Sequence, residues 1–94
     1  MNVLTDISET FKVLGDETRL RIFEALGKEE LCVSEIAKRT EISESAVSHQ
    51  LRILRLASLV SSNKAGKKVY YRIADKHVGH MMNDCREHVL ELRG

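Results

Sequence analysis

Five side chains that can bind a metal ion recur at helical spacing near the end of the chain. They lie at intervals of 3, 4, 4 and 3 residues and are His77, His80, Asp84, His88 and Glu91. Three of the four histidines belong to this stripe, and no lysine interrupts it. Imidazole and carboxylate groups bind zinc and neighbouring first-row metals. The stripe therefore predicts a metal site, although the same histidines could make ordinary hydrogen bonds at an interface.

One copy of this segment cannot bring its outer histidines to a single ion. The expected helix spans 75–92 and begins at Asp75, a good N-cap. His77 and His88 would lie roughly 16 Å apart along it, whereas zinc–nitrogen bonds are about 2 Å long. His80 and Asp84 are rival ligands, because they could share an ion with His88 within one chain.

Two antiparallel copies of the helix remove this obstacle. If they cross near residue 83, His77 of one copy faces His88 of the other, and Asp75 faces the region of Glu91. A two-fold dimer would then hold two identical sites, each with two imidazoles and two carboxylates. This closed set suits Zn(II), with Co(II) or Ni(II) as alternatives. A neighbouring apolar stripe predicts the dimer seam and comprises Val78, Met82, Cys85, Val89 and Leu92.

The segment 34–58 predicts a helix-turn-helix. A short helix over 34–40 precedes a tight turn plugged by Ile42, and the Ser43 hydroxyl can cap a second helix. Apolar residues recur in that second helix at i, i+4 and i+7, namely Val47, Leu51 and Leu54. Its other face is small and polar, then basic, and comprises Ser45, Ser48, His49, Arg52 and Arg55. This face is typical of a helix that reads DNA, although an ordinary solvated amphipathic helix shows it too.

Residues 60–73 predict a β-hairpin with a basic tip formed by Lys64, Lys67 and Lys68. A basic hairpin after a recognition helix indicates a wing that touches flanking DNA, rather than a plain solvated hairpin. The charge distribution agrees: residues 43–72 contain six Lys/Arg and one acid, or +5, and the remainder contains nine Lys/Arg and thirteen acids, or −4. We therefore expect one basic face to meet operator DNA.

The remaining segments predict scaffold. A first helix over 4–14 ends at Gly15, and a second over 17–26 is capped by Asp16 and ends at Gly27 in the αL conformation. The first helix carries an apolar stripe of Leu4, Ile7, Phe11 and Leu14. A short apolar entry, Leu31-Cys32-Val33, leads into the helix-turn-helix. The whole is expected to be one domain over 1–94, mainly α with a β-hairpin wing, a winged helix-turn-helix that dimerises through its N- and C-terminal helices.

Composition excludes several classes of protein. The 94 residues carry a net charge of +1, with 43% hydrophobic and 31% charged residues, as in ordinary globular domains. No apolar run approaches the roughly 18 residues of a membrane span, and no signal peptide is visible. Cys32 and Cys85 form no CxxC motif, which favours a reduced cytoplasmic setting. No nucleophile–base pair or phosphate loop is visible, so we expect neither an enzyme nor a small-molecule substrate.

The sequence resembles the ArsR/SmtB family of winged-helix metal-sensing repressors over nearly its whole length. The resemblance rests on FKVLGDETRLRIFEAL, ELCVSEIA, ISESAVSHQLRILR, KKVYYRIAD and DKHVGHMMNDCREHVLE. The pattern Asp-x-His, ten residues, His-x-x-Glu is similar to the zinc site of the SmtB branch and marks Asp75, His77, His88 and Glu91. The family's recognition-helix contacts would fall on Ser45, Ser48 and His49. Family members are homodimers that bind operator DNA, and metal at the C-terminal helices weakens that binding.

The sequence departs from the family pattern at a second, thiolate-rich site. Many relatives place its ligands at an ELCxC motif, or at ELCV together with the N-terminal arm. Here Cys32 and Glu35 match the ELCV version, but residue 34 is serine, and residues 1–14 contain neither Cys nor His. We therefore expect Cys32 to be a buried small apolar residue, and a cadmium, lead or arsenic sensor is disfavoured.

The resemblance also implies a mechanism. The apo dimer would bind an imperfect palindrome with its recognition helices one DNA turn apart, about 34 Å, and zinc would favour a dimer that no longer matches this spacing. In relatives the zinc-bound histidine passes the signal to a backbone carbonyl, which here indicates His88 and the region of Ser58. Two alternatives remain: a terminal helix that serves dimerisation only, or a redox switch of Cys32 and Cys85, which would need the two thiols to be close.

Overall fold

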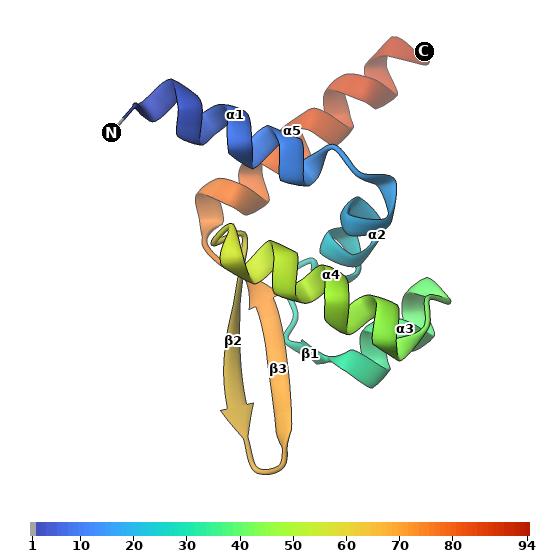
Figure 1. The fold of residues 1–94 in the computed structure, drawn as a ribbon. Helices are drawn as coiled ribbons and strands as arrows, with labels where there is room; N and C mark the ends of the chain where they lie inside the picture. The colour runs from blue at the N-terminus through green and yellow to red at the C-terminus, as the bar shows by residue number, and fades with distance from the viewer. Residues whose placement is uncertain (1) are drawn as a thin grey trace.

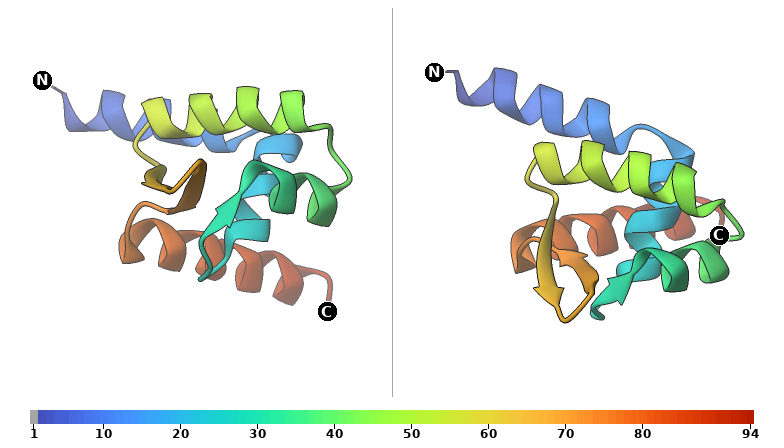
Figure 2. Two further views of the ribbon diagram at one scale, coloured as in Figure 1. Left: turned by 90° about the horizontal axis from the view of Figure 1, so that it is seen from below. Right: turned by 60° about the horizontal axis from the view of Figure 1, so that its bottom comes forward.

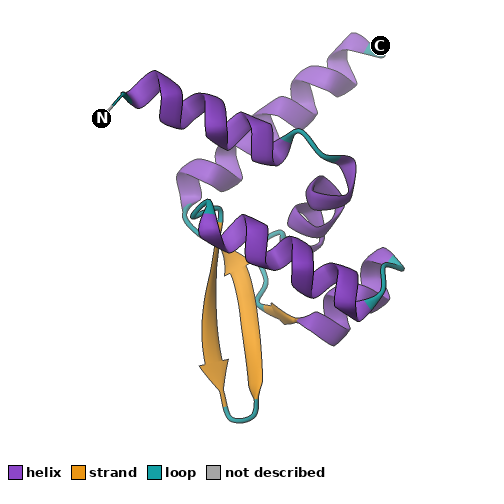
Figure 3. Cartoon of the chain, viewed as in Figure 1, coloured by secondary structure: helices purple, strands orange, loops and turns teal. Residues whose placement is uncertain are grey.

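The computed structural model describes residues 2–94 as five helices and a three-stranded antiparallel sheet (Figure 1; Figure 3). In chain order the elements are α1 (Val3–Leu14), α2 (Glu17–Leu26), β1 (Leu31–Cys32), α3 (Val33–Thr40), α4 (Glu44–Leu56), β2 (Val60–Ala65), β3 (Lys68–Ile73) and α5 (Lys76–Leu92). This order of elements confirms the prediction of a mainly helical α+β chain with a β-hairpin.

Helix ends follow from the local sequence. Asp16, Ser43 and Asp75 each accept a hydrogen bond from the backbone N–H three residues further on, at 3.0, 3.2 and 2.9 Å. All three predicted N-caps are therefore confirmed. α2 ends at Gly27 as predicted, but with φ of 48° and ψ of −118° this glycine lies outside the αL region. A residue with a side chain would be strained there, because φ is positive.

The core lies between α2, the helix-turn-helix and the base of the hairpin. Its buried apolar residues are Leu14, Ile22, Phe23, Leu26, Leu31, Ile36, Val47, Leu51, Leu54, Leu59 and Val60. The inward stripe predicted for α4 is confirmed, since Val47, Leu51 and Leu54 are fully buried. Ile42 packs against this core from the turn between α3 and α4, as predicted. Burial of this stripe fixes which face of α4 remains in solvent.

The sheet ties the hairpin to the helix-turn-helix. β3 is its central strand, in the order β1-β3-β2. Leu31 pairs with Tyr71 and Cys32 with Tyr70, so the segment expected to be only an apolar entry forms a strand. At the far end, Ala65 pairs with Lys68 around a two-residue turn. Gly66 has φ of 65° at the first position of that turn, which favours glycine and is typical of tight hairpins.

The two terminal helices leave only part of their apolar stripes uncovered, since Val78 and Met82 of the predicted α5 seam are half-buried against the core. In α1 only Leu14 is buried, whereas Leu4 is 74% and Phe11 56% exposed. In α5 no residue is buried, and Leu92 is 73% exposed. Both helices lie at the end of the molecule opposite the hairpin tip, and α5 forms a layer apart from α1 and α4 (Figure 1; Figure 2). No helix within residues 2–94 is long and apolar enough to cross a membrane.

Candidate DNA interface and metal centre

The outer face of α4 carries the predicted DNA-binding residues. Ser45, Ser48, His49 and Arg52 are all exposed, as is Arg55 towards the end of the helix. They are exposed because the opposite stripe of α4 is held in the core. Short hydroxyl side chains at the start of the helix let its backbone approach base edges, and the arginines can bind phosphate or guanine. This face can therefore enter a major groove without rearrangement of the core.

Non-glycine residues in the left-handed region lie on both sides of α4. Glu41 ends α3 with φ of 59° and ψ of 29°, and Ser58 follows α4 with φ of 58°. Ser58 donates its backbone N–H to the carbonyl of Arg55 at 3.0 Å, and Leu59 donates to Leu54 at 2.9 Å. These two bonds form a Schellman motif, in which glycine is the usual left-handed residue. Neither left-handed position is predictable from residue type, because neither holds a glycine or an asparagine.

The hairpin carries its basic residues far from the core. Lys64, Lys67 and Lys68 are exposed at and beside the turn, and Figure 1 shows that this turn projects away from the helices. The tip and the outer face of α4 are therefore two separate polar surfaces. A DNA duplex offers two matching features, a groove for the helix and a flanking backbone for the lysines.

Cys32 and Glu35, which match part of the second metal motif, serve to begin α3. The Glu35 carboxylate accepts a hydrogen bond from the backbone N–H of Cys32 at 3.0 Å, one arm of a capping box. This bond lowers the pKa of the Glu35 carboxyl, and the positive charges of Lys68 and Arg39 lower it further. The predicted burial of Cys32 is confirmed, and its Sγ lies 3.2 Å from the Ser34 hydroxyl. Both residues thus have a structural role without metal.

The four predicted metal ligands lie on one helix and its cap, and all are exposed: Asp75, His77, His88 and Glu91. Between residues 2 and 94, no three His, Cys, Asp or Glu side chains are grouped so that they could hold an ion. His80, Asp84 and His88 are therefore not gathered within one chain. Asp75 uses Oδ1 to cap α5, which leaves its Oδ2 available to another partner. The donor set suits Zn(II) only when a second copy adds ligands.

The two cysteines are both free thiols in different parts of the fold. Cys32 is buried in the sheet, whereas Cys85 is exposed on α5. A switch between them within one chain would require a rearrangement of the core around β1. The fold therefore gives no support to the redox alternative.

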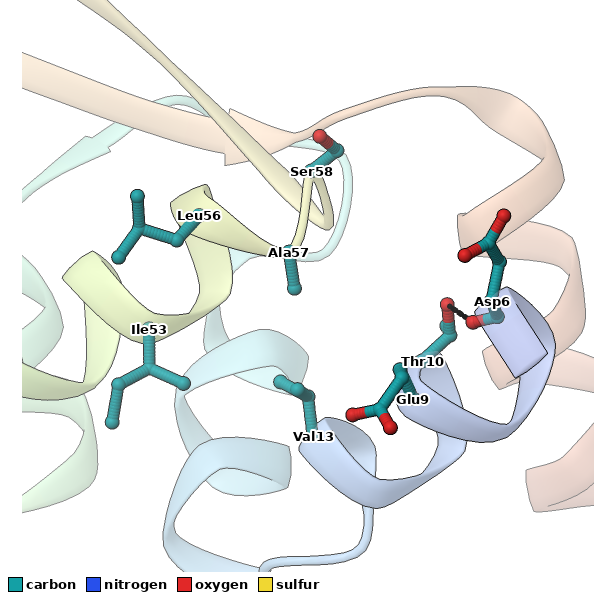
Figure 4. Close-up of a pocket in the computed structure, with 8 residues that line it drawn as sticks. All are labelled: Asp6, Glu9, Thr10, Val13, Ile53, Leu56, Ala57 and Ser58. Carbon is teal, nitrogen blue, oxygen red and sulfur yellow. Dashed lines mark hydrogen bonds between the residues drawn. The ribbon is translucent and has the colours of Figure 1, made fainter. Parts of the chain in front are cut away.

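An open pocket of about 480 Å³ separates α1 from the end of α4 (Figure 4). It is lined by Asp6, Glu9, Thr10, Val13, Ile53, Leu56, Ala57 and Ser58. Leu56 lines the pocket and is 75% exposed. The pocket reaches Ser58, which lies in the region where the resemblance implies a backbone acceptor for the metal-bound histidine.

Comparison with known proteins identifies one family. The family model described as "Bacterial regulatory protein, arsR family" matches residues 16–62. The chain is 46% identical over 85 residues to the "Transcriptional repressor SmtB homolog" of Synechocystis sp. (strain ATCC 27184 / PCC 6803 / Kazusa), a match that covers 90% of this chain and 64% of that relative. It is 38% identical over 88 residues to the "Cadmium resistance transcriptional regulatory protein CadC homolog" of Staphylococcus aureus, covering 93% of this chain and 73% of that relative. The chain thus spans less than two thirds of the length of the first of these relatives and more than two thirds of the length of the second.

The fold is also similar to a solved structure. The solution NMR structure of the homodimeric winged helix-turn-helix DNA-binding domain Mb0332 from Mycobacterium bovis, described as a possible ArsR-family transcriptional regulator, matches with a TM-score of 0.89. The identity is 28%, and the match covers 95% of this chain and 82% of that chain. The prediction of a winged helix-turn-helix is therefore confirmed.

Proposed function

The chain belongs to the arsR family of bacterial regulatory proteins, a family of transcriptional regulators rather than enzymes, and from that premise we propose that it is a metal-responsive repressor. In this proposal an apo homodimer binds operator DNA in the cytoplasm, and Zn(II) at the C-terminal helices releases it. One observation carries the proposal: α5 exposes four ligand side chains next to a partly uncovered apolar stripe.

DNA binding would use the outer face of α4 and the hairpin tip. Ser45, Ser48 and His49 would meet base edges, and Arg52 would meet a phosphate or a guanine. Lys64, Lys67 and Lys68 would neutralise phosphates beside the groove. In support, these groups are all exposed, and the basic segment 43–72 contrasts with the acidic remainder of the chain.

Dimerisation would cover the exposed stripes of α1 and α5. Exposed large apolar side chains lie on both helices, namely Val3, Leu4, Ile7 and Phe11 on α1 and Val89, Leu90 and Leu92 on α5. The similar Mb0332 domain is a homodimer. A two-fold axis near residue 83 of α5 would bury these stripes against their copies.

The same dimer would complete the metal site. Asp75 and His77 of one copy and His88 and Glu91 of the other would hold Zn(II), which supplies a fixed link between the two helices when bound. His88 would use one ring nitrogen as a ligand and donate from the other towards the backbone near Ser58. A cadmium resistance regulator is among the similar proteins, so the choice of Zn(II) rests on the donor set, which lacks thiolate.

A Co(II) titration tests the site, with His88→Ala and His80→Ala as a matched pair from the same stripe of α5. We expect intense d–d bands, typical of four-coordinate Co(II), that saturate at one ion per chain. They should vanish in His88→Ala and persist in His80→Ala. Loss in both variants would move the site to the rival His80 set. Weak six-coordinate bands, or operator binding indifferent to Zn(II), would leave a DNA-binding regulator whose terminal helix only dimerises.

A further inference from the structure

Arg19 connects three helices through its side chain. It lies in the first turn of α2 and is half-buried. Its Nε donates to the backbone carbonyl of Val13 at 2.7 Å, and its Nη1 donates to Oε1 of Gln50 at 3.2 Å. The guanidinium therefore bridges the last turn of α1 and the middle of α4.

The chemistry of this bridge requires arginine. The carbonyl of Val13 is one of the last four of α1, which have no partner within the helix and carry the negative end of its dipole. A guanidinium satisfies that carbonyl and reaches a second acceptor at the same time, because its donors diverge from a rigid plane. A lysine ammonium at this position could serve either acceptor as a point charge but could not fix the angle between them.

Apart from Leu14, which lies in the same core cluster as the inner face of α4, few groups hold α1 against α4. The open pocket of about 480 Å³ lies between them, with Val13 and Ile53 on facing walls (Figure 4). No hydrogen bond joins the two helices directly within residues 2–94. Gln50 is half-buried and belongs to neither the buried stripe of α4 nor its outer face. The Arg19 bridge therefore ties the end of α1 to α4 without occupying the surface offered to DNA.

We infer that Arg19 is a positioning residue that couples α1 to α4 and thereby sets the separation of the two recognition helices in the dimer. The inference rests on the proposed function, since it requires a dimer formed through the terminal helices and an operator with two half-sites. Each recognition helix would keep its own contacts to DNA. The bridge would determine which spacing of half-sites both helices can reach together.

The test compares Arg19→Lys with Arg21→Lys on operators of altered spacing. Arg21 is a matched control because it also projects from α2 and donates to a helix-terminal carbonyl, that of Thr40 at 3.0 Å. An operator is first selected from random DNA with the wild-type protein, and one or two base pairs are then added or removed between its half-sites. We expect wild type and Arg21→Lys to lose at least about 10-fold in affinity when the spacing changes. Arg19→Lys should lose less than about threefold, with its dimerisation unchanged.

A second variant separates positioning from simple destabilisation. Gln50→Leu should flatten the spacing preference in the same way, and the double variant should add nothing further, because both changes remove one interaction. Additive effects, or a lowered melting temperature with the spacing preference intact, would overturn the inference while leaving the proposed function standing. Failure of the wild-type protein to select any two-half-site operator would overturn the proposed function, and this inference with it.

Discussion

Glu35 shows how one side chain can resemble a metal ligand while its present role is to begin a helix. Its carboxylate accepts a hydrogen bond from the backbone N–H of Cys32, and the strength of that hydrogen bond depends on the negative charge of the carboxylate. The ELCV motif alone could not distinguish these roles, because a capping box and a ligand pair place the same residue types at the same spacing. The distinction required the position of the carboxylate relative to the backbone.

The lowered pKa of Glu35 predicts a pH-dependent contribution to stability. A carboxyl whose folded pKa is depressed stabilises the fold above its unfolded pKa, near the ordinary value of 4.5, and this contribution is lost as pH falls through the folded value. Urea unfolding should therefore show that Glu35→Gln is less stable than wild type at neutral pH. The difference should shrink in acid, below about pH 4. Glu9→Gln, which removes an exposed charge on α1, serves as the control, and a difference independent of pH would contradict the capping role.

At the scale of the element, α4 is flanked on both sides by a non-glycine residue in the left-handed conformation, which its sequence does not predict. The stripe of Val47, Leu51 and Leu54 and the cap at Ser43 predicted the helix and its inner face correctly. Glu41 and Ser58 adopt left-handed conformations because the tight turn before α4 and the Schellman motif after it require them. Neither residue type favours the left-handed region, so residue propensity alone would not predict these conformations.

Ser58→Gly should stabilise the protein, since glycine reaches φ of 58° without a clash of Cβ. We expect a gain of about 0.5–1 kcal/mol in the free energy of unfolding, because the removed strain is partly offset by the greater freedom of glycine in the unfolded chain. Denaturant unfolding measures this gain. Ser58→Val, a β-branched residue, should destabilise by a similar amount or more. Equal stability of all three proteins would mean that the left-handed conformation of Ser58 carries no strain.

The sheet contains the element that sequence reasoning missed. β1 has only two residues, too few for an alternating pattern, and it exists because Leu31 and Cys32 pair with Tyr71 and Tyr70 of β3. The hairpin was predictable because two β-capable runs flank a glycine turn. Its connection to α3 through β1 was not, since that pairing spans some forty residues of sequence.

The hairpin tip should contribute charge rather than sequence recognition. Replacing Lys67 and Lys68 by alanine should weaken binding to any duplex by a similar factor, and it should reduce the slope of log K against log salt by about 2, or roughly 0.9 per phosphate contact. Fluorescence anisotropy over a range of salt concentrations measures both quantities. Lys12→Ala on α1 should leave the slope unchanged. A loss confined to the preferred operator would instead show that these lysines read bases.

At the scale of the whole molecule, the single chain, taken over residues 2–94, leaves apolar residues of α1 exposed and does not assemble the ligand stripe of α5 into a site. The sequence predicts an apolar stripe on α1 and dimerisation through this helix, and Leu4 and Phe11 of that stripe are mostly exposed in the single chain. The ligand stripe of α5 is equally incomplete, because its outer histidines lie about three turns apart on one helix. Periodicity identifies apolar and ligand faces but does not say whether the same chain or a copy will cover them. The proposed antiparallel pairing of α5 with its copy would complete the ligand set, and a dimer through the terminal helices would also cover the α1 stripe.

In the proposed dimer the metal site and the recognition helices would be parts of one equilibrium, so their effects on each other would have to be equal. If Zn(II) weakens operator binding by a given factor, operator DNA must weaken Zn(II) binding by the same factor, typically about 5–150-fold. Zn(II) affinity measured by competition with a chelator, with and without saturating operator, should reproduce the factor found in DNA titrations. His88→Gln, if it still binds Zn(II), should bring both factors close to one, because the flexible amide of glutamine does not reproduce the fixed direction in which a ligated imidazole would donate towards the backbone near Ser58. Retention of the full factor in that variant would show that the signal leaves the metal site by a route other than His88.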